Sequence, residues 1–127
     1  VMDVFTPGIH GSTYGGNPLA CAVASAALDV LVDERLVEKT AELGEHFKQR
    51  LLDLKTDKVR EIRCIGLWAG VQLRPEAGGA RQYCYALKDR GMLCKDTHVD
   101  TIRLAPPLVI TRAQLDWALD QLEAVLA

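Results

Sequence analysis

Apolar residues recur at helical spacing over long parts of this chain. Residues 18–33 are apolar on nearly every face, which predicts a long helix that requires burial on most sides. One short domain cannot wrap such a helix completely, so we expect a missing domain or a second subunit to cover part of it. Residues 33–54 carry one apolar stripe opposite charged positions, which predicts a surface helix. A final helix is expected after Thr111, because Thr111 and Gln114 form a T-x-x-Q capping box before an apolar repeat.

The middle of the chain changes to a period of two. Apolar side chains alternate with polar or small ones towards residue 73, which predicts a half-buried strand over residues 59–73. Gly66 is expected to mark a bulge or bend between two pieces of that strand. A further helix is predicted over residues 80–90, and Gly91 stands where helices often end.

Two short strands are predicted near the C-terminus, over residues 92–95 and 101–105. The polar connection between them suits a hairpin, and a double proline ends the second strand. The order of elements is therefore helix, helix, strands, helix, hairpin, helix. This order predicts a two-layer α/β (α+β) fold, in which helices cover one face of a small, mainly antiparallel sheet and the long buried helix precedes it.

Composition limits the possible function classes. The chain has 127 residues, of which 49% are hydrophobic and 25% charged, as expected for one globular domain with a single core. A net charge of −2, with basic residues scattered among acidic ones, gives no reason to expect nucleic acid or a membrane surface as partner. The four cysteines and three histidines show no metal-ligand spacing, so no metal site is expected. The cysteines are expected to be reduced core residues.

A glycine-rich stretch over residues 10–19 is the first candidate site. Its three glycines let backbone N–H groups turn towards a ligand, and Ser12 and Thr13 add hydroxyl donors. Asn17 is a plausible N-cap with Pro18 at the first helical position, so a helix begins directly after the loop. The stretch thus suits a bound anion such as phosphate. An ordinary loop that leads into a helix remains the alternative, because the spacing is that of neither a Walker loop nor a dinucleotide fingerprint.

Arg103 is the second candidate. It lies between apolar residues in a strand that ends at Pro106 and Pro107, so its guanidinium leaves the sheet on the opposite face from its neighbours. A planar guanidinium can bind a carboxylate through two parallel hydrogen bonds. The alternative is an edge-strand arginine paired with a surface carboxylate.

The sequence of residues 8–21 resembles the segment that follows the cofactor lysine in class III, fold-type-I pyridoxal phosphate aminotransferases. Arg103 stands in a similar R-x-x-P-P setting, and the run that begins at Arg63 matches a strand turn of that family's small domain. The resemblance implies that Thr13 and Ser12 contact the phosphate of a pyridoxal 5'-phosphate held by the other subunit of a homodimer. It also implies that Arg103 binds a carboxylate of the amino acid or 2-oxo acid substrate.

The segment K-x-T-H at Lys95, Thr97 and His98 resembles the ornithine δ-aminotransferase branch of this family more than the acetylornithine or 4-aminobutyrate branches. That branch moves the δ-amino group of ornithine to 2-oxoglutarate, which gives glutamate semialdehyde and glutamate. His98 could instead be a loop histidine without a chemical role, and the match is weak over residues 75–83. Acetylornithine or another class III aminotransferase is the first alternative, and a stand-alone anion-binding or dimerisation module is an alternative of another class.

The family's cofactor lysine lies shortly before the glycine-rich stretch, and no lysine of this chain stands at a matching position. We therefore expect a C-terminal fragment with no catalytic residue of its own and no activity by itself. The resemblance implies that residues 1–33 form the cofactor-phosphate loop and an interdomain helix, and that residues 34–127 form the small C-terminal domain. It also implies a cytoplasmic enzyme, or a mitochondrial matrix enzyme in a eukaryote.

Overall fold

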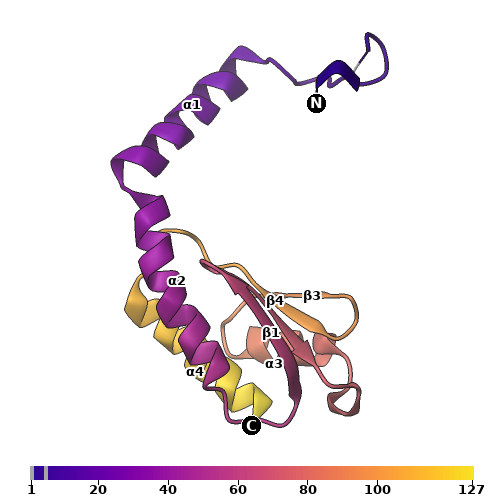
Figure 1. The fold of residues 1–127 in the computed structure, drawn as a ribbon, viewed down its shortest axis with the longest axis vertical. Coiled ribbons are helices and arrows are strands. Elements are labelled where there is room, and N and C mark those ends of the chain that lie inside the picture. Colours follow the sequence, from indigo (N-terminus) through magenta and orange to yellow (C-terminus); the bar gives the residue numbers. More distant parts are fainter. Residues whose placement is uncertain (1, 5) are drawn as a thin grey trace. The chain divides into compact units, whose positions relative to one another are not determined.

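The computed structural model describes residues 2–4 and 6–127, with Met2 described by its backbone alone. The chain divides into two compact units, with the boundary in the sequence between Arg35 and Leu36; Figure 1 shows the ribbon of both. The first unit holds a short 3-10 helix, η1 (Met2–Val4), a glycine-rich loop and helix α1 (Pro18–Asp33).

Helix α1 has the predicted bounds. The Asn17 side chain accepts a hydrogen bond from the Ala20 backbone N–H (3.1 Å), and Pro18 occupies the first turn. The predicted burial is not found within the first unit, since no residue of α1 is buried there. The apolar faces of α1 are therefore exposed here, and their expected cover by another domain or subunit stays a prediction.

The second unit is a sheet with helices on one face. Its elements in chain order are α2 (Leu36–Leu52), β1 (Val59–Ile65), β2 (Trp68–Leu73), η2 (Pro75–Ala77), α3 (Ala80–Asp89), β3 (Lys95–Thr97), β4 (Thr101–Leu104) and α4 (Arg112–Leu126). The four strands lie in the order β1-β2-β4-β3, and every neighbouring pair is antiparallel. This confirms the predicted two-layer α+β architecture.

The stretch predicted as one bent strand is in fact a hairpin. Ile65 pairs with Trp68, so Gly66 and Leu67 form a two-residue connection between β1 and β2. Gly66 has a φ of +52°, and glycine at the first central position of such a connection is typical of a II′ hairpin turn. The prediction of a bend was wrong because buried Leu67 continues the apolar alternation through the turn.

The second hairpin is confirmed, but its strand β3 begins three residues later than predicted. The turn consists of residues 98–100, and both His98 (φ +49°) and Val99 (φ +68°) adopt the left-handed conformation. This conformation is unusual for a β-branched residue. The turn is fixed by two backbone hydrogen bonds of 2.8 Å, from Ala80 N–H to Val99 O and from Leu73 N–H to Asp100 O.

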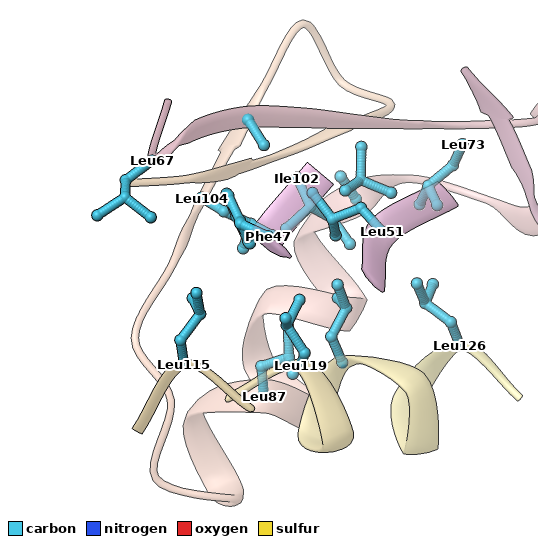
Figure 2. Close-up of a cluster of buried hydrophobic side chains, with 14 residues drawn as sticks. Phe47, Leu51, Leu67, Leu73, Leu87, Ile102, Leu104, Leu115, Leu119 and Leu126 are labelled. Carbon is cyan, nitrogen blue, oxygen red and sulfur yellow. The ribbon is translucent and has the colours of Figure 1, made fainter. Parts of the chain in front are cut away.

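The core lies between the sheet and helices α2, α3 and α4. Figure 2 shows the α4 side chains Leu115, Leu119 and Leu126 on the helix side that faces the sheet residues Leu104, Ile102 and Leu73. Helix α4 has both hydrogen bonds of the predicted capping box, which is therefore confirmed. Each strand turns alternate side chains away from the helices, so no helix of the second unit covers the opposite face of the sheet, which is called the open face below.

Two further observations concern the described residues. None of their helices is both long and apolar enough to cross a bilayer. The four cysteines are free thiols: Cys21 is exposed, contrary to the predicted core position, and the other three are half-buried. Burial raises the pKa of the Cys94 thiol to about 12, so this group stays protonated at neutral pH.

Candidate functional site

The glycine-rich loop of the first unit presents hydroxyl groups at an exposed turn. Ser12 Oγ accepts a hydrogen bond from the Gly15 backbone N–H (3.0 Å), and this bond leaves the Ser12 hydroxyl proton available as a donor. The Thr13 hydroxyl makes no hydrogen bond to any residue that the structure describes. Gly16 has a φ of +77°, which is the backbone freedom that the sequence predicted for this loop.

These groups are suited to an oxyanion. Ser12 and Thr13 are both exposed, and neither hydroxyl proton is committed to a described acceptor. No carboxylate lies among residues 6–17 to repel an anion. Phosphate binding therefore remains a prediction that the loop conformation suits.

The strand register places three basic side chains in one row on the open face of the second unit. Arg63 of β1 pairs with Gly70 of β2, Gly70 pairs with Arg103 of β4, and Arg103 pairs with Lys95 of β3. Directly paired residues of a sheet project on the same face. The open face therefore carries a basic row, defined as Arg63, Arg103 and Lys95, with a glycine between the two arginines.

Arg103 occupies the position that the sequence predicted. It is exposed, whereas its neighbours Ile102 and Leu104 are buried among core residues. Among the described residues the guanidinium of Arg103 has no hydrogen-bond or ion-pair partner. The surface ion pair that was the alternative interpretation is thus absent from this part of the protein, and the guanidinium is available to a ligand.

A chain of hydrogen bonds runs beside the basic row. Arg63 Nη1 donates to Glu61 Oε2 (2.7 Å) and to Gln72 Oε1 (3.0 Å). Gln72 Nε2 donates to Asp100 Oδ2 (2.9 Å), and the Thr101 hydroxyl donates to the other oxygen of the same carboxylate (2.9 Å). Hydrogen bonds from Gln72 and Thr101 lower the pKa of the Asp100 carboxyl. These bonds link β1, β2 and the β3–β4 turn.

The open face is hollowed over this row. A shallow depression of about 470 Å³ is lined by both arginines of the row, by Trp68 and by His98. Trp68 is 61% exposed although it is large and apolar. The depression therefore combines fixed positive charge with an aromatic wall, as sites for small carboxylic acids commonly do.

His98 lies at the edge of the depression, in the turn whose backbone is left-handed. It lines the same depression as Arg103. The His98 side chain makes no hydrogen bond to any described residue, so the alternative of a loop histidine without a chemical role stays open.

The predicted site residues fall in two units: Ser12 and Thr13 in the first, Arg103 in the second. Sequence reasoning missed the grouping of Arg63 and Gly70 with Arg103. The alternation of Arg63 with half-buried Ile62 and Cys64 was a signal that it faces away from the core. Its alignment with Arg103 depends on the register of three strands, and no local pattern specifies that register.

Comparison with known proteins gives one family. A sequence model of the family described as Aminotransferase class-III matches residues 1–126. The chain is 57% identical over 127 residues to the ornithine aminotransferase of Bordetella pertussis, covering 100% of this chain and 31% of that protein. It is 52% identical over 126 residues to the ornithine aminotransferase of Oceanobacillus iheyensis, covering 99% of this chain and 31% of that protein. The chain thus spans about a third of the length of these relatives.

Solved structures give the same result. An acetylornithine aminotransferase from Elizabethkingia anophelis matches with a TM-score of 0.86 and 48% identity, covering 99% of this chain and 32% of that one. Plasmodium falciparum ornithine delta-aminotransferase matches with a TM-score of 0.89 and 39% identity, covering 99% of this chain and 33% of that one. Since the family match extends over nearly all of its residues, this chain belongs to the class III aminotransferases.

Proposed function

We propose that this chain is the C-terminal part of a pyridoxal phosphate-dependent ornithine aminotransferase. The complete enzyme transfers the δ-amino group of ornithine to 2-oxoglutarate and releases glutamate semialdehyde and glutamate. The observation that carries this proposal is 50–57% identity, over essentially the whole chain, to several proteins named ornithine aminotransferase. The guanidinium of Arg103, which is exposed and has no partner among the described residues, supports it, because each half-reaction uses a substrate with a carboxylate.

The glycine-rich loop is proposed to hold the phosphate of pyridoxal 5'-phosphate bound mainly by the partner subunit of a homodimer. The available hydroxyl protons of Ser12 and Thr13 fit such an acceptor. When bound, the cofactor supplies an aldehyde that carries the amino group from one substrate to the next and accepts electron density from the reacting carbon. The chain's own contribution is to hold and orient the phosphate.

Arg103 is proposed to bind a substrate carboxylate in the depression on the open face. Its fixed charge and planar donors select a carboxylate over a neutral group and fix its orientation. The substrate is thereby oriented for reaction at the far end of the molecule. No catalytic residue is assigned to this chain, and we propose that the cofactor lysine belongs to another part of the complete enzyme.

The two parts of the chain are proposed to have separate tasks. Residues 1–33 would supply the phosphate loop and an interdomain helix, and residues 34–127 would form the small C-terminal domain. The exposed apolar faces of α1 support this division, because they require a cover from another domain or subunit. A cytoplasmic location is proposed for a bacterial enzyme, and the mitochondrial matrix for a eukaryotic one.

Acetylornithine aminotransferase is the second candidate, because one such enzyme is 48% identical to this chain. The two are separated by adding ornithine or N-acetylornithine to the complete enzyme and following the absorbance of the bound cofactor. We expect ornithine to convert the cofactor and to yield glutamate semialdehyde. Conversion by N-acetylornithine alone would contradict the proposed substrate.

The role of Arg103 is tested in the same assay with Arg103→Lys. This variant keeps the charge and loses the planar fork, so kcat/KM should fall most in the half-reaction that places a carboxylate here, which we assign to glutamate and 2-oxoglutarate. The half-reaction with ornithine should change less. A lower melting temperature of Arg103→Lys with unchanged kinetics would indicate that Arg103 has a structural role and does not bind the carboxylate.

A further inference from the structure

The guanidinium of Arg63 lies over β2 and not at the outer edge of the sheet. Its Nη2 atom is 3.8 Å from the place that a Cβ on residue 70 would occupy. Gly70 is the direct pairing partner of both Arg63 and Arg103. The side chain from β1 therefore reaches across to the strand that neighbours Arg103.

Arg63 is held there by one of its two terminal nitrogens. Nη1 donates both to Glu61 (2.7 Å) and to Gln72 (3.0 Å), and Gln72 is itself fixed by Asp100. Nη2 has no acceptor among the described residues. The guanidinium is thus fixed in position while its second nitrogen, the one over Gly70, remains available.

The spacing of strands brings the two arginines within reach of one ligand. Neighbouring strands lie about 4.8 Å apart, so the Arg63 guanidinium over β2 is roughly one strand spacing from the backbone of Arg103. Gly70 has no side chain to fill the space between them. A carboxylate seated over Gly70 can accept hydrogen bonds from both guanidinium groups.

We propose that Arg63 is a second carboxylate-binding residue of this site and that Gly70, which has no side chain, leaves the space between Arg63 and Arg103 open for the carboxylate. The proposal rests on the proposed function, because it takes the carboxylate of the amino acid or 2-oxo acid substrate as the ligand. Glu61 neutralises part of the charge of Arg63 from the side remote from Arg103. The pair can therefore lie on one face in the absence of a ligand, and the ligand carboxylate compensates the remaining charge.

The competing explanation is that Arg63 only forms an ion pair with Glu61 on an exposed strand. Both residues are about half exposed, and such pairs contribute little to stability. The two explanations differ in what removal of each partner does. Loss of Glu61 should leave ligand binding intact if Arg63 binds the ligand, whereas loss of Arg63 should not.

The test measures binding of glutarate, a five-carbon dicarboxylate that cannot be transaminated, to the complete enzyme by titration calorimetry. Arg103→Gln provides the reference loss, and we expect Arg63→Gln to raise the dissociation constant about tenfold, as loss of a charge-assisted hydrogen bond does. Glu61→Gln should bind glutarate at least as tightly as the parent protein. Arg90→Gln is the matched control, because it removes one positive charge from the end of α3, where Arg90 bonds Gln121.

Substitution of Gly70 provides a second, independent test of the same binding site. A Cβ here would lie 3.3 Å from Thr101 Cγ2, so a small adjustment admits it, and Gly70→Val places methyl groups in the space between the two arginines. We expect at least tenfold weaker glutarate binding in a folded protein, with Gly79→Ala as control because its added Cβ makes only an ordinary contact. If Gly70→Val fails to fold, Gly70→Ala should show the same direction of change.

The inference is overturned if Arg63→Gln binds glutarate within twofold of the parent protein while Arg103→Gln does not. It is also overturned if Glu61→Gln weakens binding as much as Arg63→Gln, since the effect would then arise from local folding. Should Arg63→Gln not fold, Arg63→Lys keeps the charge and should give a smaller loss in the same direction. Glutarate binding requires no turnover, so a failure of the enzyme to use ornithine would refute the proposed function without deciding the role of Arg63.

Discussion

Gly44 provides the most direct test of how the helix layer positions the open face. It is a buried residue in the middle of α2, and a Cβ at this position would lie 2.6 Å from Gly66 Cα and 2.9 Å from Gly66 O. These are backbone atoms of the β1–β2 turn and cannot move aside as a flexible side chain does. Gly44→Ala must therefore push the hairpin away from α2.

Two opposing effects set the magnitude. Alanine is favoured over glycine in a helix interior by about 1 kcal/mol, which stabilises the variant. Overpacking costs typically about 1–3 kcal/mol, and a contact between two backbones belongs at the upper end. Movement of the turn also disturbs the packing of Phe47, one turn further along α2 in the core. We expect a net loss of about 2 kcal/mol in the free energy of unfolding.

Urea denaturation followed by far-ultraviolet circular dichroism measures this loss. Ala41→Gly is the matched control, because Ala41 is exposed on the same helix and its replacement should cost only the helix preference of about 1 kcal/mol. Gly44→Ala should be less stable than the parent chain in spite of its better helix preference. Equal or higher stability of Gly44→Ala would refute the close approach of α2 to the turn.

Two further predictions concern single side chains. Thr13→Ala in the complete enzyme removes one hydrogen bond to phosphate, so the dissociation constant for pyridoxal phosphate should rise about 10- to 100-fold, while Thr6→Ala, exposed in the same unit, should leave it unchanged. An unchanged constant for Thr13→Ala would mean that the loop is only a turn. The hydrogen bond from His46 (2.6 Å) lowers the pKa of Asp116, so this carboxylate stabilises the fold above the ordinary carboxyl pKa of about 4, and the contribution is lost as the pH falls through the lowered value. The urea midpoint should fall over that range in the parent chain and fall less in Asp116→Asn; parallel curves would contradict this.

Local signals explain which elements were predictable. The start of helix α1 was predictable because Asn17 and Pro18 give a local start signal. The capping box of α4 was equally local, since it involves residues three positions apart. The β1–β2 hairpin was missed because Leu67 is buried in the turn itself, so the apolar alternation continues through the point where the chain reverses direction. The sequence therefore specified element type well wherever the determining contacts were near in the chain.

The site was predictable only in part for the same reason. The exposure of Arg103 follows from the alternation within one strand, and this was read correctly. The position of Arg63 beside it depends on pairing across β2, which involves residues up to forty positions apart. The turn at His98 and Val99 contains no glycine, so the sequence gives no local sign of its left-handed backbone. Its conformation is fixed by hydrogen bonds from Ala80 and Leu73, which are distant in sequence.

These contacts indicate how a small domain holds a binding face without burying it. The β1–β2 hairpin, which carries Arg63, is fixed from behind by the contact of its turn with Gly44. The β3–β4 turn is fixed by the first residue of α3 and by the end of β2. Each turn that borders the basic row is therefore held at least in part by a helix: α2 at the β1–β2 turn and α3 at the β3–β4 turn. The guanidinium of Arg103 and Nη2 of Arg63 consequently need no part in fixing these turns, because backbone contacts fix them.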